Sequence, residues 1–127
     1  MIAQIKKDIV PVLRRLGFTG TYPHYRRVAP QQIDLVTFQF YSSGGQFVVE
    51  VGKFPPTGYE LYGRLIPPES VRMAHLLQHR IRLGKTVEIS DPWILFEDRD
   101  LPTVTAEVVR LLETEAEEFW RSGIAGG

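Results

Sequence analysis

The sequence predicts an α+β domain, in which an antiparallel sheet of four to five strands carries the N- and C-terminal helices on one face. Two observations predict it. Hydrophobic residues recur at helical spacing at both ends of the chain, and they alternate with polar residues at a period of two in the middle. A chain of 127 residues can bury a core of its own, so residues 1–127 are expected to form a single domain.

The first segment, residues 2–16, has the pattern of an amphipathic helix. Its apolar side chains recur three or four positions apart, and its lysines and arginines lie on the opposite side. Pro11 cannot donate a backbone hydrogen bond, so we expect a kink there, or a new start with Asp8 as N-cap. Gly17 suits a left-handed helix end, with Phe18 folding back onto the last turn.

The middle of the chain is predicted to form three strands. Residues 24–28 form a short first strand, and residues 33–41 form a longer one with strict alternation. One face of the longer strand is apolar, with Val36, Phe38 and Phe40. The sequence SSGG at 42–45 suits a tight reversal, after which residues 46–51 alternate again. The outward side chains of this third strand are predicted to be Val48 and Glu50.

The rest of the chain is predicted to complete the sheet and to end in a helix. Four prolines in two pairs break regular structure, so residues 54–75 are expected to form a long connection with one short helical turn. Residues 78–83 alternate again and form a strand, and residues 91–96, DPWILF, form another short one. From Pro102 to Arg121 the apolar spacing is helical.

The charge is balanced overall but unevenly distributed. Residues 1–85 hold twelve lysines and arginines and five acids, whereas residues 86–127 hold three and ten. We interpret this asymmetry as complementarity between two halves that fold together, and the balanced total predicts little non-specific attraction to phosphate. No apolar run approaches the roughly 20 residues that span a bilayer. The absence of cysteine and of a signal peptide favours a cytoplasmic protein without membrane contact.

Several short motifs follow one another along the chain. They are Gly17 and Phe18 after the first helix, Tyr25 and Arg26, the strand residue Gln39, the group Arg80, Arg82 and Gly84, and the pair Asp91 and Trp93. In their order and spacing the chain resembles a bacterial family, domain-of-unknown-function family 4304, over nearly its whole length. Ile94 stands where that family often has a second aromatic residue, and a cysteine expected before the arginine-rich strand is missing. The resemblance implies the fold and no activity.

The sequence gives no clear sign of catalysis, so we expect no catalytic residue, no cofactor and no metal. His75 and His79 are four residues apart, but His79 falls in a predicted strand and no third ligand accompanies the pair. The glycines of SSGG lead into a strand and not into a helix, which is unsuited to a phosphate cradle. The serines do not lie in a nucleophile elbow. These serines are Ser42, Ser43, Ser70 and Ser90.

A candidate binding surface lies on the predicted sheet face away from the helices. It consists of Thr37, Gln39, Glu50, Arg80 and Arg82, with Tyr25 and Arg26 as further candidates. One interpretation is that Glu50 only forms a cross-strand ion pair with an arginine, worth about 0.2–1 kcal/mol. The other is that the arginines bind an acidic protein surface, a carboxylate or a phosphate through their bidentate geometry.

The preferred function is therefore a non-enzymatic binding or interaction module whose partner is another protein with an acidic surface. Toxin-neutralising immunity proteins are an example of such small proteins, by analogy alone. One alternative is nucleic-acid binding through the arginine and tyrosine face, which the balanced charge disfavours. Another is a hydrolase that uses the acids of EDRD, although acids in a loop before a helix are more often turn and cap residues. These acids are Glu97, Asp98 and Asp100.

Overall fold

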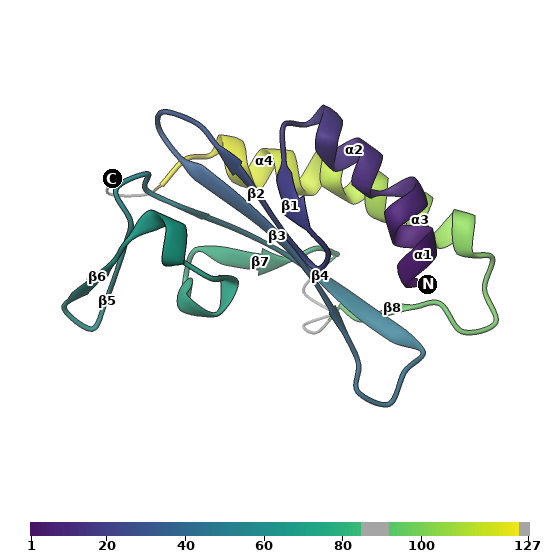
Figure 1. Cartoon of the computed structure of the whole chain (residues 1–127). Coiled ribbons are helices and arrows are strands. Elements are labelled where there is room, and N and C mark those ends of the chain that lie inside the picture. The colour runs from purple at the N-terminus through teal and green to yellow at the C-terminus, as the bar shows by residue number, and fades with distance from the viewer. Residues whose placement is uncertain (85–91, 125–127) are drawn as a thin grey trace.

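The computed structural model describes residues 1–84 and 92–124, and it confirms the α+β architecture. An antiparallel sheet has the strand order β1-β2-β3-β4-β7, and β8 pairs with another part of β4, so the sheet has six strands, one more than the upper prediction. The helices lie together over one face of this sheet (Figure 1). The strands are β1 (Thr19–Thr21), β2 (His24–Val28), β3 (Ile33–Phe40), β4 (Gln46–Phe54), β7 (Arg80–Arg82) and β8 (Ile94–Leu95).

The N-terminal helix is divided into α1 (Ile2–Asp8) and α2 (Val10–Arg15), which meet at Ile9. Pro11 therefore lies in the first turn of α2, where its missing N–H has no helical partner to lose. Asp8 does not cap α2 as the alternative prediction had it. Its carboxylate instead accepts hydrogen bonds from Gln4 at 2.6 Å and from Thr105 at 2.6 Å, and the second bond joins α1 to the C-terminal helix.

The C-terminal helix consists of α3 (Leu101–Leu111), a π-helical turn η3 (Leu112–Ala116) and α4 (Glu117–Arg121). Its buried hydrophobic residues recur at every fourth position, and they are Val104, Val108, Leu112, Ala116 and Trp120. In a regular α-helix each step of four residues turns about 40° too far, so such a row would drift off the sheet. The wider π turn compensates for this drift and brings Trp120 back to the core.

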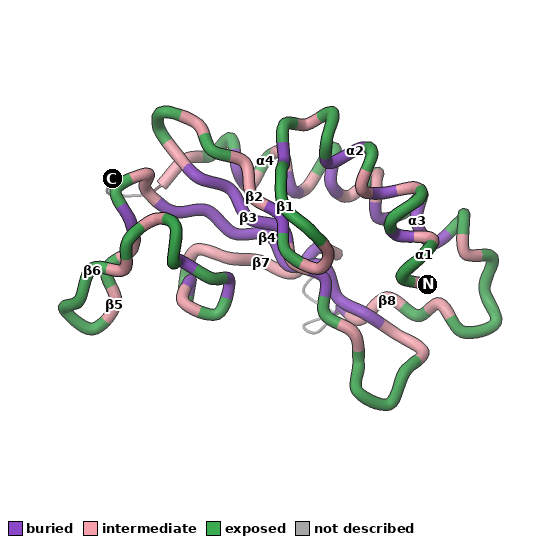
Figure 2. The backbone as a smooth tube through the Cα atoms, viewed as in Figure 1, coloured by how far each residue is buried: buried purple, intermediate pink, exposed green. Residues whose placement is uncertain are grey.

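The main core lies between the helices and the sheet. Val36 and Phe38 of β3 are buried in it and Phe40 is packed against it, as the alternation predicted. Figure 2 shows that β3 and β4 carry the longest buried stretches of the chain. Val48 alternates with Phe47, Val49 and Val51 of the main core, so it lies on the outward face as predicted, and it is nevertheless 0% exposed. The face of the sheet away from the helices is therefore itself partly covered.

A second, smaller core explains part of this cover. Ile33, Leu35 and Phe54 project from the sheet on the side away from the helices, and the connection after β4 packs onto them. The residues of the connection that do so are Val71, Met73 and Leu76. Both faces of the sheet are therefore covered near this end.

The connection after β4 contains more structure than predicted. It forms a hairpin of β5 (Tyr59–Leu61) and β6 (Arg64–Ile66) that projects from the body (Figure 1), and then two 3-10 turns, η1 (Pro68–Ser70) and η2 (Met73–His75). The proline pairs come before and after the hairpin, so they bound it without interrupting its hydrogen bonds. β1 was also missed, because its three residues lie in a turn-rich segment.

Two of the sequence predictions fall on residues outside the described part of the chain. They concern Ser90 and the Asp91 of the tryptophan motif. Among the described residues, no helix has the length and apolar character that crossing a membrane requires.

Candidate binding cleft

The strand register brings four of the predicted site residues onto one face. Glu50 stands between Thr37 on β3 and Arg82 on β7. Gln39 is opposite Val48 and Arg80 is opposite Gly52, two residues to either side of Glu50 on β4, and side chains two apart in a strand share a face. Glu50, Gln39, Arg80 and Arg82 therefore lie together on the side of the sheet away from the helices.

Glu50 holds the two arginines near it without hydrogen bonding to them. Its carboxylate lies 3.8 Å from Arg80 and 3.8 Å from Arg82, which is longer than a hydrogen bond. The carboxylate is almost buried, whereas both arginine side chains are 33% exposed. Arg80 also donates to the carbonyl oxygen of Met73 at 3.1 Å. The Arg80 guanidinium is thus oriented by one hydrogen bond and by the nearby carboxylate of Glu50, and it is still accessible.

The other two predicted site residues have different surroundings. Tyr25 is 3% exposed and packs edge-on against Phe38 in the core under the helices, so it does not share the face of the arginines. Arg26 does point to that face, but its guanidinium donates to the carbonyls of Pro68 at 2.9 Å and Val71 at 3.0 Å. Both are predicted as surface residues because β2 is short and its pattern does not show which of its sides is covered.

A cleft of about 630 Å³ lies along this region of the sheet. Its wall includes His24, Gln39, Glu50, Arg72 and Arg80, and on another side Ile2 and Tyr22. A neighbouring hollow of about 430 Å³ shares part of the wall, including His24 and Arg72, and adds Arg26. We call the two together the polar cleft.

The polar cleft carries excess positive charge. Its described charged lining residues are three arginines, Arg26, Arg72 and Arg80, and one acid, Glu50. The pKa of Arg26 is lowered, first by burial and then by the positive charge of Arg72, while Glu69 acts in the opposite direction. The repulsion between these arginines indicates that a negatively charged group would be stabilised between them.

Arg72, Tyr22 and His24 were not predicted as site residues. Arg72 comes from the connection that packs across the sheet, and Tyr22 comes from the turn between β1 and β2. Neither position shows a periodicity, so its place beside β3 depends on the tertiary structure. His24 lies beside Thr37 in the register, and its Nδ1 atom is 3.2 Å from the Thr37 hydroxyl.

The remaining histidines and the acid Asp100 have structural contacts. His75 accepts the backbone N–H of Arg72 at 2.9 Å, and His79 lies 3.0 Å from the Tyr59 hydroxyl. Asp100 caps α3 by accepting the N–H of Thr103 at 3.2 Å. Within residues 1–84 and 92–124, no group of three histidine, aspartate or glutamate side chains is arranged to hold a metal ion.

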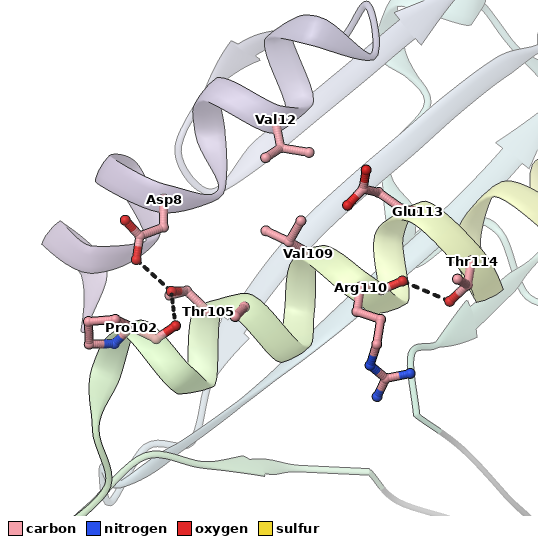
Figure 3. Close-up of a pocket in the computed structure, with 9 residues that line it drawn as sticks. Asp8, Val12, Pro102, Thr105, Val109, Arg110, Glu113 and Thr114 are labelled. Atoms are coloured by element: carbon pink, nitrogen blue, oxygen red, sulfur yellow. Dashed lines mark hydrogen bonds between the residues drawn. The ribbon is translucent and has the colours of Figure 1, made fainter.

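A second cavity, of about 570 Å³, lies between the N-terminal helix and α3 (Figure 3). Val12 and Val109 line its middle, with Asp8 and Glu113 near its ends. The hydrogen bond from Thr105 is the largest cause that lowers the pKa of Asp8, followed by the bond from Gln4. The Asp8 carboxylate thus bonds to residues on both helices that form the walls, which indicates a structural role for it.

Comparison with known proteins connects this structure to a family. No curated protein sequence matches the chain, and no solved structure matches it. The family model described as domain of unknown function, DUF4304, matches residues 9–122, from the junction of α1 and α2 to the end of α4. The matched range includes the whole sheet and most of the polar cleft. The chain therefore belongs to the DUF4304 family.

Proposed function

We propose that this protein is a non-enzymatic binding module whose polar cleft receives an acidic segment of another protein. The observation that carries the proposal is the arrangement of Arg80. Glu50 and the Met73 carbonyl orient its guanidinium from within the protein, while a third of the side chain remains exposed to the cleft. An oriented arginine loses little conformational freedom when it binds a carboxylate.

The charge of the cleft supports an acidic partner. Arg72 is exposed and lines the same cleft as Arg80. The carboxylates of one acidic peptide segment can therefore reach both guanidinium groups. Arginine forms bidentate hydrogen bonds to carboxylates, and a bond with a charged group contributes about 1.5–3 kcal/mol. The nearly buried Glu50 offsets part of the positive charge of the arginines. A partner with a single acidic group would therefore be attracted only weakly, and a partner with several acidic groups is favoured.

The cleft offers little support for an enzyme. His24 and Thr37 form a hydroxyl–imidazole pair, but nucleophilic catalysis also needs a third group that orients the imidazole. His24 contacts no such group in the described part of the chain. The EDRD acids support a hydrolase no better, because Asp100 serves as the cap of α3. The nucleic-acid hypothesis relied on Tyr25 as an exposed aromatic residue beside the arginines. Tyr25 is instead buried on the other face of the sheet, so it offers no stacking surface there.

Binding measurements with defined probes test the proposal. A synthetic peptide rich in glutamate and a single-stranded oligonucleotide would each be titrated against the protein in physiological salt. We expect the peptide to bind. The double variant Arg72→Glu, Arg80→Glu should lower the affinity for the peptide by at least about tenfold, since two charged hydrogen bonds are lost. The control Arg64→Glu makes the same type of charge change on the exposed β6 strand and should leave binding unchanged.

Two results would overturn the proposal. One is a peptide affinity that does not change in the double variant. The other is tighter binding of the oligonucleotide, with an affinity that falls steeply as the salt concentration rises, because that is the signature of phosphate contacts.

A further inference from the structure

We propose that the acidic segment binds as an extended β-strand, added to the open edge of β3 beyond the end of β2. This inference rests on the proposed function and specifies the conformation and sequence pattern of the partner. Strand addition of this kind derives its affinity from backbone hydrogen bonds and its specificity from alternate side chains.

The edge of β3 is open because its two neighbours differ in length. β4 pairs with β3 as far as Phe40, whereas the register with β2 ends at the pair of His24 and Thr37. Before His24 the chain turns through Tyr22 and Pro23 into β1. In Figure 1 the β3–β4 hairpin accordingly extends past the end of β2.

The backbone hydrogen bonds show which groups of β3 face this opening. The Phe38 N–H donates to Pro23 at 3.1 Å on the β2 side, and the Tyr41 N–H donates to Gln46 at 2.9 Å on the β4 side. Successive residues of an antiparallel strand direct their backbone groups to alternate neighbours. The N–H and C=O of Phe40 therefore point to the β2 side, where no strand within the described residues pairs with them.

The lining of the cleft agrees with an edge position. Four consecutive residues of β3, at 37–40, line the same cleft. Consecutive side chains of a strand point to opposite faces, so a hollow above one face could not contact all four. A hollow that follows the strand edge and continues over the face with Glu50 and Arg80 does contact all of them, and an incoming strand would occupy its part along the edge.

The two walls of the cleft predict the sequence of the partner. Of the residues that line it, Ile2 belongs to α1, and Tyr22 and Phe40 pack against the core under the helices. We take these as an apolar wall, opposite Arg72 from the covering connection and Arg80 from β7. A strand between the walls would direct alternate side chains to each of them. The partner should therefore alternate acidic and apolar residues. A second copy of this chain fits less well, since pairing two such edges would bring like-charged arginines together.

Two peptides of the same composition would separate this mode from simple charge attraction. One alternates glutamate with valine, and the other places the same residues in separate blocks. We expect the alternating peptide to bind at least about tenfold more tightly, because only its acids all reach the arginine wall and each charged bond contributes about 1.5–3 kcal/mol. Hydrogen exchange measured by NMR should show new protection of the Phe40 amide when this peptide is bound.

A pair of variants tests the backbone contact. Phe40→Pro removes the N–H that faces the opening, and proline is tolerated at such an edge position because no bond to β4 is lost. This variant should bind the alternating peptide about tenfold more weakly than the natural protein does. Phe40→Leu keeps the N–H and an apolar side chain, so its affinity should remain close to that of the natural protein. If Phe40→Pro does not fold, the exchange of the Phe40 amide in the natural protein still decides the question.

The failure of this inference and that of the proposed function give different results. Equal binding of both peptides without protection of Phe40, but with loss in the Arg72 and Arg80 double variant, would overturn the strand mode alone. No binding of either peptide would overturn both proposals. Protection of Phe40 that rises with protein concentration in the absence of peptide would show that a second copy occupies the edge, and this too would overturn the strand mode proposed here.

Discussion

The guanidinium group of Arg27 lies 4.9 Å from the centre of the Trp120 ring and 4.7 Å from that of Phe18. It also pairs with Asp34 at 2.9 Å and with Glu117 at 3.3 Å. Arg27 therefore connects β2 to the neighbouring strand and to the last helix. Because side chains alternate along a strand, the adjacent Arg26 points to the other face, and both arginines of β2 bond within the protein.

Replacement of Arg27 by methionine should lower the free energy of unfolding by about 3 kcal/mol, because the buried Asp34 would lose its charged partner. Urea denaturation measures this loss. In the double variant Arg27→Met, Asp34→Leu most of the stability should return, since the buried carboxylate is then removed and the carboxylate that loses its partner, Glu117, is partly exposed. Arg64→Met, on the exposed β6 strand, is the matched control. A loss below about 1 kcal/mol would mean that Arg27 contributes no more than an exposed ion pair does.

Arg26→Ala should loosen the connection that covers the far face of the sheet without unfolding the protein. The two hydrogen bonds of Arg26 to Pro68 and Val71 contribute about 1–3 kcal/mol together, which corresponds to a rise in local opening of about 5- to 150-fold. Hydrogen exchange of the Leu76 amide, whose bond to Met73 lies in that connection, should accelerate accordingly. The amides of β3 paired with β4 serve as the internal control, and equal acceleration there would contradict a local effect.

Gly52→Ala should destabilise the protein by about 1–3 kcal/mol through overpacking. A Cβ atom at this position would lie 2.6 Å from Leu76 Cδ1 and 2.9 Å from Met73 Sδ, so these two buried side chains would have to shift. Thermal or urea unfolding measures the effect. The same change in a Leu76→Val background should cost less, since the closest atom is then removed, and equal costs in both backgrounds would disprove the proposed contact.

Thr105→Val should destabilise the protein in a way that depends on pH. The bond from Thr105 lowers the pKa of Asp8 below its ordinary value of 3.8, so it contributes stability above that pH. This stability is lost as the pH falls through the lowered pKa and the carboxylate takes up a proton. The difference between the natural protein and the variant should therefore be constant near neutral pH and shrink in acid. A difference that persists unchanged at low pH would assign the effect to packing.

Much of the sheet could be predicted because its signals are local. Val36, Phe38 and Phe40 alternate with polar residues, and this period of two is a property of the strand itself. The same alternation correctly placed Glu50, Arg80 and Arg82 on one face. Tyr25 was misplaced because the alternation of a five-residue strand shows which residues share a face, but not which face the helices cover.

The rest of the cleft could not be predicted from any local pattern. Arg72 reaches it only because Val71, Met73 and Leu76 bury apolar surface against the far face of the sheet. The accessible edge of β3 exists only because β2 ends before β4 does.

The sequence by itself determined the two helical ends, the alternating strands and the side of the sheet on which the acid and its two arginines lie. These features follow from periodicity, which each segment carries in its own residues. The tertiary structure alone decided which arginines are bound internally, which ones are accessible in the cleft, and where a strand edge stays open. Such properties arise from contacts between segments distant in the chain, and no single segment encodes them.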